Sequence, residues 1–316
     1  MKNKKLKIAF AGTPAFAIPT LEAIFKSGYD IPFVLTQPDR KSGRGLILKP
    51  TPIKKKAKEF KIPIFQPEKF DDEVFKKIVN FNADILVVAA YGLIIPSKIL
   101  DIFVKGSYNV HASLLPAWRG AAPIHRAIEA GDSKIGVTIM LVAPALDSGD
   151  MVRKKSINLS KNSTTGEITE FLSKLGAKLM VQVLDDINNN KSLELIPQKK
   201  SMVTYAKKIN KIEAKIIWKD ITSNKLIRKI NAFNPAPGVF CYFREKILKI
   251  WEADNEGNIG KIGLGELFID SKNNDLFVGT VDGAIRIKLI QLEGKRKMIA
   301  KEFIVANKIV NGDYLS

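Results

Sequence analysis

The segment Asp84-Ile85-Leu86-Val87-Val88-Ala89-Ala90 is apolar without interruption from Ile85 onward. A strand inside a parallel sheet is covered on both faces and has such a continuous apolar run, so this segment predicts a central strand. Other patterns flank it along the chain: strands at 7–11, 31–35 and near Ile64, and helices at 16–25, 53–60 and 71–80. Because strands alternate with helices, we predict a doubly wound, Rossmann-like α/β domain.

The second part of the chain has a different pattern. Residues 191–206 are polar and irregular, which is typical of a linker. After a helical pattern at 223–232 come five short strand-like runs separated by glycines: 239–243, 247–253, 263–269, 276–279 and 284–292. Such strands indicate a smaller C-terminal β-barrel of the oligonucleotide-binding type. We therefore predict an N-terminal α/β domain over 1–190, closed by a helix at 165–184, a linker over 191–206 and a barrel domain over 207–316.

Composition limits the class of protein. The chain of 316 residues has no apolar run near the roughly 20 residues that span a membrane, so no membrane association is expected. The first residues lead into a strand without a signal-peptide pattern, and Cys241 is the only cysteine, so a cytoplasmic location is expected. Cys241 lies in an apolar run and is expected to be buried. With one cysteine, two histidines and no dense carboxylate cluster, no metal site is expected.

The formal net charge of +19 favours an anionic partner such as a nucleic acid. A second interpretation stays open, because the excess cations are mostly lysines spread along the whole chain, and such a bias needs no function. Arginines are then the more informative cations. Arg40, Arg44, Arg119 and Arg126 all fall in or near the segments that carry candidate site residues.

Three residues suggest chemistry. Asn109 and His111 stand two apart at the end of a strand-like run, so their side chains project to the same face. Asp147 follows a second apolar run, 135–142, which could lie in the same sheet. An amide donor, a titratable ring and an acid in one place suit acyl transfer. Taken singly, Asn109 could be a turn former and Asp147 a loop cap.

Several longer motifs accompany these residues. They are the runs 11–17 (Ala-Gly-Thr-Pro-Ala-Phe-Ala), Gln37–Gly45, 109–111 with 113–124, 146–151, 233–235 (Phe-Asn-Pro) and 311–313 (Asn-Gly-Asp). Together they resemble the methionyl-tRNA formyltransferases, a group of the folate-dependent formyltransferase family, from about residue 6 to the end. The Asn-x-His…Asp set resembles the set of residues that all folate-dependent formyltransferases share. Three features make the resemblance to the methionyl-tRNA formyltransferases more specific: the Ser-Leu-Leu-Pro-x-Trp-Arg-Gly run, the Gln-Pro-Asp-Arg loop and the second domain.

The resemblance implies a formyltransferase catalytic domain and a tRNA-binding barrel. The formyl group of 10-formyltetrahydrofolate would pass to the α-amino group of methionyl initiator tRNA, for translation initiation. Asn109 would donate to the carbonyl oxygen as it becomes an oxyanion. His111 would hold that oxygen as a cation or by proton transfer, and Asp147 would favour the charged ring and help to remove the amine proton.

The resemblance also implies binding residues, and we expect the protein to be a monomer. The folate would lie along 113–116 with the pteridine beside 91–96 and 142–145; the residues named for this role are Ser113, Leu114, Leu115, Pro116, Tyr91, Gly92, Leu93 and Ile94. The Leu115–Pro116 bond would be cis, as in relatives. Arg40 and Arg44, in the polar loop over 37–45, would contact tRNA, although the same loop could be only a solvated turn.

The chain departs from the family pattern at four places. Ala15 replaces an acidic residue, Ala236 replaces an aromatic residue, and Leu46-Ile47-Leu48 replaces a more basic stretch. Residues 141–145 replace a Gln-Met-Asp-x-Gly type run, and Pro144 removes one backbone N–H donor there. None of these departures touches Asn109, His111 or Asp147.

Other interpretations remain beside this one. His125, on a helix expected over 121–130, is interpreted as a packing or surface residue, and Trp118 as a loop anchor. The same three catalytic residues would serve a formyltransferase that acts on an amino-sugar nucleotide or a purine precursor. A third alternative is an RNA-binding protein that has lost catalysis.

Overall fold

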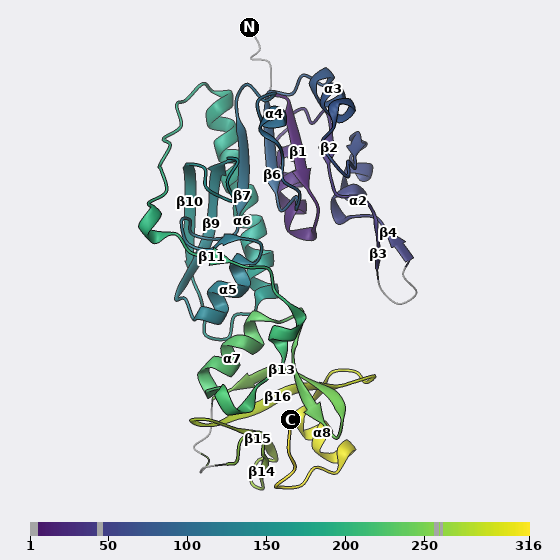
Figure 1. The fold of residues 1–316 in the computed structure, drawn as a ribbon, viewed down its shortest axis with the longest axis vertical. Helices are drawn as coiled ribbons and strands as arrows, with labels where there is room; N and C mark the ends of the chain where they lie inside the picture. The colour runs from purple at the N-terminus through teal and green to yellow at the C-terminus, as the bar shows by residue number, and fades with distance from the viewer. Residues whose placement is uncertain (1–5, 43–46, 256–258, 260–261) are drawn as a thin grey trace. The chain divides into compact units, whose positions relative to one another are not determined.

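The structure, a computed structural model, describes residues 6–42, 47–255, 259 and 262–316. The chain divides into two units, which Figure 1 labels by element. The first comprises Met1–Pro123, Lys134–Ile157 and Thr169–Ala206, and the second comprises Ile124–Ser133, Asn158–Ile168 and Lys207–Ser316.

A seven-stranded sheet forms the centre of the first unit, in the order β10-β9-β7-β6-β1-β2-β5. Its strands are β1 (Ile8–Gly12), β2 (Val34–Leu35), β5 (Ile64–Phe65), β6 (Ile85–Ala89), β7 (Ser107–His111), β9 (Lys134–Leu141) and β10 (Met151–Asn158). Pairing is parallel from β5 to β7 and antiparallel between β7 and β9. All five residues of β6 are buried, which confirms the central strand predicted from 84–90.

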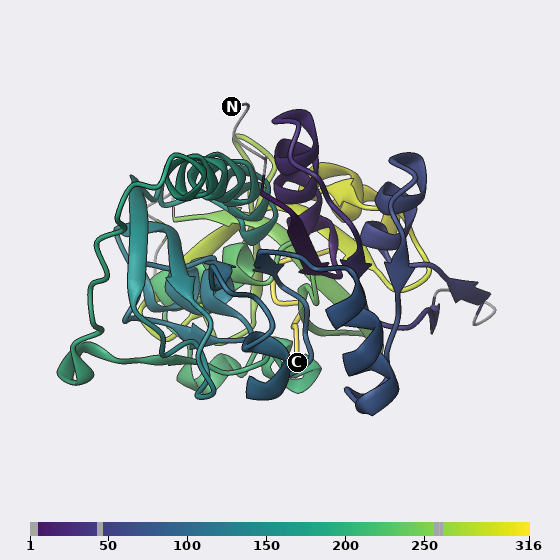
Figure 2. The same ribbon diagram turned by 90° about the horizontal axis from the view of Figure 1, so that it is seen from above.

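Helices cover both faces of this sheet (Figure 2). On one face lie α1 (Ile18–Lys26), α2 (Pro52–Glu59) and α6 (Thr165–Asn188), and on the other α3 (Asp72–Asn80) and α4 (Ser97–Leu100). Ile78 of α3 and Ile99 of α4 share a buried cluster with Leu86. The side chains of Thr51 and Asp71 cap α2 and α3 by accepting a backbone N–H each. The doubly wound α/β prediction is therefore confirmed.

The segment after β2 differs from the loop expected over 37–45. Arg40–Ser42 forms strand β3, which pairs antiparallel with β4 (Ile47–Lys49). Residues 40–42 of the expected loop therefore form one side of a two-stranded ladder. Each strand has only three residues, too few to give a period-2 signal in the sequence. Arg44 lies outside the described residues.

Residues 191–206 make specific contacts with the first unit. They contain a short 3₁₀ helix, η2 (Lys200–Met202), and strand β11 (Tyr205–Ala206). Strand β11 pairs in parallel with β8 (Arg119–Gly120), and the paired residues stand 86 positions apart in the sequence. A Cβ at Gly120 would come within 2.7 Å of the Ala206 carbonyl oxygen, so this close approach requires glycine.

The second unit contains an antiparallel sheet with the order β12-β13-β16-β15-β14, and β17 pairs with β16. Its elements are β12 (Val239–Phe243), β13 (Lys246–Asp254), β14 (Leu267–Asp270), β15 (Asp275–Thr280), β16 (Gly283–Leu292), β17 (Met298–Ile299), α5 (Pro123–Ala130), α7 (Ser223–Ala232) and α8 (Ala300–Asn307), with 3₁₀ helices at Lys211–Ala214 and Trp218–Asp220. The expected β-sheet of the second domain is confirmed as this antiparallel sheet, which is accompanied by helices α5, α7 and α8. Strands β12 to β16 fall on the five predicted runs, although β14 begins only at Leu267, whereas β17 lies outside those runs.

Cys241 is fully buried on β12, as expected. Burial raises the pKa of its thiol, so the side chain behaves as an apolar core group. Among the described residues no helix is both long enough and apolar enough to cross a membrane. Within the same residues no group of three histidine, cysteine, aspartate or glutamate side chains is arranged to hold a metal ion.

His125 gives a testable pH effect. Its imidazole is half-buried on α5, and burial lowers its pKa despite a hydrogen bond with the backbone of Ala236. The nearby Arg126 lowers the pKa further, and Glu129 opposes this. Since the unfolded histidine titrates near a pKa of about 6.5, the unfolded chain takes up the proton first as the pH falls.

We therefore expect stability contributed by neutral His125 to be present above about pH 6.5 and to be lost on acidification. Thermal unfolding at pH 7 and pH 5 tests this in the wild type and in His125→Gln. The unfolding temperature of the variant should decrease less than that of the wild type between pH 7 and pH 5. Equal losses would show that His125 does not contribute.

Candidate active site

Strand β7 ends with two of the three candidate catalytic residues. Asn109 pairs with Met140 and His111 with Thr138 on the antiparallel strand β9. Being two apart on one strand, their side chains leave the same face of the sheet. The His111 side chain is buried, with 5% of its surface exposed, whereas Asn109 is half-buried. The Asn109 amide makes no hydrogen bond with any residue that the structure describes, so its donors remain available for a ligand.

The His111 ring lies between two acceptors. Its Nε2 is 2.9 Å from the Trp118 carbonyl oxygen, and its Nδ1 is 3.5 Å from Oδ2 of Asp147. A carbonyl oxygen can only accept, so Nε2 carries a proton and donates to it. The Asp147 carboxylate lies on the Nδ1 side of the ring, so both nitrogens of His111 face an oxygen atom.

Asp147 reaches this ring from the turn after β9. The backbone N–H of Gly120 donates to its Oδ2 at 2.8 Å, so the carboxylate also holds the segment that follows Trp118. Asp147 has a positive φ of 45°, which aspartate tolerates better than most residues. A Cβ at Gly149 would overlap the carbonyl oxygen of Leu141, so the turn lies tightly against the end of β9. The structure thus brings His111 and Asp147 together, with Asn109 on the same strand as the histidine.

The predicted folate segment after β7 is a tightly bonded turn. The Ser113 hydroxyl donates to the Ala117 carbonyl oxygen at 2.6 Å. The Thr138 hydroxyl donates to the Ser113 carbonyl oxygen at 2.8 Å and accepts from the Leu115 N–H at 3.2 Å. Leu115 and Pro116 are buried, Leu114 is half-buried, and the Leu115–Pro116 bond is cis, as expected. Ser113 therefore shapes the turn with its hydroxyl rather than offering that group to a ligand.

The second predicted folate segment follows β6. The Tyr91 carbonyl oxygen accepts from the Thr13 hydroxyl at 2.7 Å and from Nε2 of Gln37 at 3.1 Å, which joins the ends of β1, β2 and β6. Burial raises the pKa of Tyr91 to about 12. Gly92 is exposed with a φ of 84°, Leu93 is half-buried, and Ile94 has 86% of its surface exposed. Leu93 and Ile94 therefore offer apolar surface at the carboxyl edge of the parallel strands, where ligands of open α/β sheets bind.

Arg40, the described member of the predicted tRNA-binding pair, is exposed on β3. The preceding Asp39 is anchored, because Lys54 Nζ lies 2.6 Å from Oδ2 and Gln66 donates to Oδ1 at 2.7 Å. The hydrogen bond from Lys54 lowers the pKa of Asp39. A charged anchor thus fixes the base of the ladder that carries Arg40.

Two residues of the expected linker also contact the site, and sequence reasoning missed them. Nε2 of Gln198 donates to the carbonyl oxygens of Asp147 and Gly149, at 2.9 and 2.7 Å. The Thr204 hydroxyl accepts the backbone N–H of Trp118 at 2.9 Å. Both lie in a polar segment without periodicity, so no sequence signal marked them.

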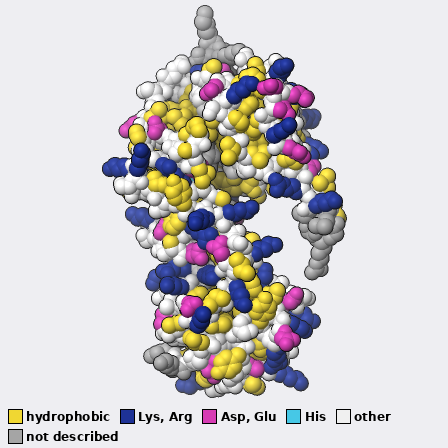
Figure 3. Space-filling view, in the orientation of Figure 1, with side chains coloured by type: hydrophobic (Ala, Val, Ile, Leu, Met, Phe, Trp, Pro, Cys, Tyr) yellow, Lys and Arg dark blue, Asp and Glu magenta, His cyan; other side chains and the backbone are white. Residues whose placement is uncertain are grey.

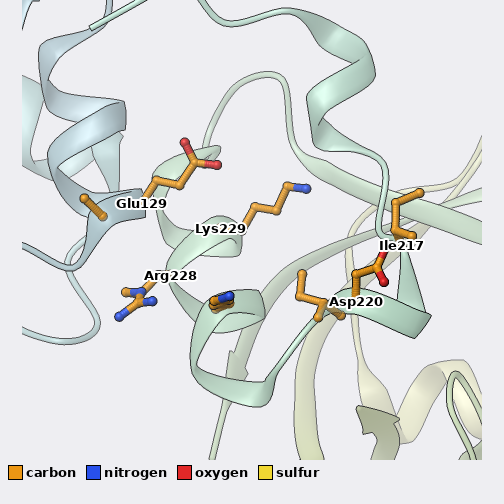
Figure 4. Close-up of a pocket in the computed structure, with 8 residues that line it drawn as sticks. Glu129, Ile217, Asp220, Arg228 and Lys229 are labelled. Carbon is orange, nitrogen blue, oxygen red and sulfur yellow. The ribbon is translucent and has the colours of Figure 1, made fainter. Parts of the chain in front are cut away.

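A cavity of about 410 Å³ lies within the second unit. Figure 4 shows its mixed lining of cationic and anionic side chains, among them Arg228, Lys229, Glu129 and Asp220. Burial lowers the pKa of Lys229. None of the predicted catalytic or folate residues lines it. On the face shown in Figure 3, lysine and arginine side chains are scattered over the surface rather than gathered in one patch.

Two family models match the chain. Residues 5–184 match the model described as formyl transferase, and residues 208–308 match the formyl transferase C-terminal domain. The methionyl-tRNA formyltransferase of Methylobacillus flagellatus is 44% identical over 309 residues, covering 98% of this chain and 99% of that protein. The enzyme of the same name from Coxiella burnetii is 42% identical, covering 97% and 98%.

Solved structures share the fold at low sequence identity. A sugar 3N-formyl transferase, WlaRD, solved in the presence of dTDP and 5-N-formyl-THF, has a TM-score of 0.66 at 20% identity, covering 93% of this chain and 100% of that one. The methionyl-tRNA formyltransferase of Clostridium thermocellum has a TM-score of 0.56 at 18% identity, covering 80% and 95%. With both family models matched and relatives above 40% identity along nearly its whole length, this chain belongs to the formyl transferase family, beside the methionyl-tRNA formyltransferases, and is a formyl-transferring enzyme.

Proposed function

We propose that this enzyme transfers the formyl group of 10-formyltetrahydrofolate to the α-amino group of methionyl initiator tRNA, in the cytoplasm and as a monomer. The observation that carries the proposal is the His111–Asp147 pair beside Asn109, in a chain that aligns with methionyl-tRNA formyltransferases through both of its units. A sugar-nucleotide formyltransferase is the rival function, and it is favoured only by a likeness of fold.

The residues at the carboxyl edge of the sheet fit a folate. A pteridine needs apolar surface and backbone polar groups, and the segment Tyr91–Ile94 with the turn at 113–116 offers both. We assign donor binding to these residues, with Ser113 shaping the turn and Leu114 contributing its half-buried side chain. When bound, the folate supplies the formyl group. Pro144, which lacks an N–H, leaves one backbone donor fewer beside this site.

The chemistry is then divided among three side chains. Asn109 donates from its unpaired amide to the formyl oxygen as negative charge develops on it. His111 supports that oxygen as a cation or by proton transfer, and Asp147 holds the ring and accepts the proton that the amine loses as the new C–N bond forms. The bond between the formyl carbon and the folate nitrogen breaks, and that nitrogen takes up a proton.

The second unit and the β3–β4 ladder are proposed to bind the tRNA. The net charge of +19 suits a polyanion, and phosphate neutralisation supplies much of nucleic-acid affinity. Arg40 is exposed next to the anchored Asp39, and Arg44 follows in the same predicted segment. Arginine offers planar donors for phosphates or base edges.

Replacing Arg40 or Arg44 with alanine is expected to lower kcat/KM for Met-tRNA by about tenfold and to leave folate binding unchanged. If an arginine contacts a phosphate, its loss should also reduce the salt slope of tRNA binding by about one unit. Steady-state kinetics and salt titrations measure both effects. Arg153→Ala on β10, whose guanidinium is paired with Asp186, is the control. If kcat/KM and the salt slope of both variants equal those of the control, the β3–β4 ladder does not bind tRNA.

The direct test of the proposed function is a product balance. Wild-type enzyme incubated with 10-formyltetrahydrofolate and Met-tRNA should yield formyl-methionyl-tRNA and tetrahydrofolate in equal amounts. Folate release without formylated tRNA would contradict the proposal.

A further inference from the structure

Residues 196–206, here called the strap, hold the two segments that complete the His111 site. At one end Ile196 exchanges both backbone hydrogen bonds with Met151, each at 2.9 Å. At the other end β11 pairs with β8. Between them Gln198 contacts the turn that carries Asp147, and Thr204 contacts the segment that carries Trp118. One stretch of chain is therefore bonded to both segments that face the His111 ring, the turn with Asp147 and the segment with Trp118.

The Gln198 amide is fully engaged in this arrangement. Arg119 donates from Nε and from one terminal nitrogen to its Oε1, at 3.0 and 2.8 Å. This charged donor fixes which side of the amide is the oxygen, so Nε2 must face the other way. Nε2 then donates both of its hydrogens to the carbonyl oxygens of Asp147 and Gly149.

These two bonds tie the turn to the strap, in addition to local bonds in which the Ser148 N–H and hydroxyl donate to the Ala145 carbonyl oxygen at 3.3 and 2.9 Å. The neighbouring Leu146 has 62% of its surface exposed, and Asp147 itself has a positive φ. The Asp147 carboxylate must nevertheless lie within reach of both His111 and the Gly120 N–H. In an active site a displacement of about 1 Å can cost about 10²-fold in rate, so a clamp on this turn has a direct catalytic effect.

We propose that Gln198, oriented by Arg119, is a positioning residue that sets the Asp147 carboxylate against His111. The inference rests on the proposed function, because it assigns Gln198 to the same catalytic site. Gln198 acts through the backbone of the turn and makes no contact with the His111 ring. Its loss should therefore slow the chemical step and leave substrate binding nearly unchanged.

Two variants test the clamp. Gln198→Glu keeps the acceptor for Arg119 but places a carboxylate oxygen against two carbonyl oxygens, and Gln198→Met removes every polar contact at similar size. Both should lower kcat at least about tenfold, with KM for folate and tRNA within about threefold of wild type. The control is Gln182→Glu on α6, since Gln182 also accepts from an arginine, Arg153, but lies on an exposed helix face. It should retain wild-type kcat.

A double-mutant cycle with Asp147→Asn separates positioning from general destabilisation. If Gln198 acts through Asp147, adding Gln198→Glu to Asp147→Asn should cost little further kcat. The inference is overturned if the fold-losses of kcat in the two single variants multiply fully in the double variant. It is also overturned if the Gln198 variants raise KM without lowering kcat, or if Gln198→Glu loses kcat and Gln198→Met does not. Activity of the Gln198 variants equal to that of Gln182→Glu overturns it while the proposed function stands, whereas absence of formyl transfer by wild-type enzyme would defeat the proposed function itself.

Discussion

Replacing Asn109 with alanine is expected to lower kcat for formyl transfer by about 10²–10³-fold, the usual cost of one oxyanion donor. The side chain stands at the carboxyl end of β7, half-buried and unpaired, two residues before His111. A donor that no described residue occupies needs no reorganisation when charge develops on the substrate oxygen. KM for both substrates should change much less than kcat, because the interaction forms mainly in the transition state.

Single-turnover and steady-state rates measure this loss, and Asn109→Asp supplies an isosteric comparison. The aspartate keeps the shape but removes the NH₂ donor and adds a negative charge, so its kcat should fall at least as far as that of Asn109→Ala. Unfolding temperatures near the wild-type value show that the loss is not one of folding. Turnover within about threefold of wild type in Asn109→Ala would refute the assignment of this residue.

Asp147→Asn should lower kcat by about 10²-fold or more, within the range that positioned proton-transfer groups contribute. An asparagine oxygen can still accept from the Gly120 N–H, so the turn is retained while the charge facing His111 Nδ1 is lost. Without that charge the His111 ring loses the anionic group that faces its Nδ1, and the amine proton loses its proposed acceptor.

Asp150→Asn is the matched control for this prediction. Asp150 lies three residues further along, where its backbone carbonyl oxygen accepts from the Leu141 N–H at 2.9 Å. This variant removes one carboxylate charge from the same turn without removing the group that faces His111. It should keep kcat near wild type. Equal losses in the two variants would mean that general charge, rather than the Asp147 carboxylate, supports the reaction.

The main features of the fold could be predicted because each has a local sequence signal. Strand β6 is buried on both faces, and its residues form an uninterrupted apolar run. Helix α3 begins at Asp72 after the cap Asp71, within one residue of the expected start. Asn109 and His111 share a face because side chains alternate along any strand, so their proximity followed from spacing alone.

The remaining features depend on contacts between distant residues. Gln198 lies 51 positions from Asp147 and 79 from Arg119, in a polar segment with no period to mark it. Helix α5 belongs to the second unit, where Arg126 forms an ion pair with Glu213 at 2.8 Å. No local sequence pattern predicts this contact. The ladder β3–β4 consists of strands too short to show alternation. Hydrogen-bond partners of this kind are set by the assembled fold, so no local pattern in a single sequence predicts them.

The central claim is that the His111 site formylates the methionyl end of initiator tRNA. The most direct measurement compares formyl transfer by wild-type enzyme from 10-formyltetrahydrofolate to Met-tRNA and to an amino-sugar nucleotide, side by side at equal concentrations. We predict that kcat/KM for Met-tRNA exceeds that for the sugar nucleotide by several orders of magnitude and that Asn109→Ala abolishes most of it. A preference for the sugar nucleotide, or equal use of the two acceptors, would contradict the account.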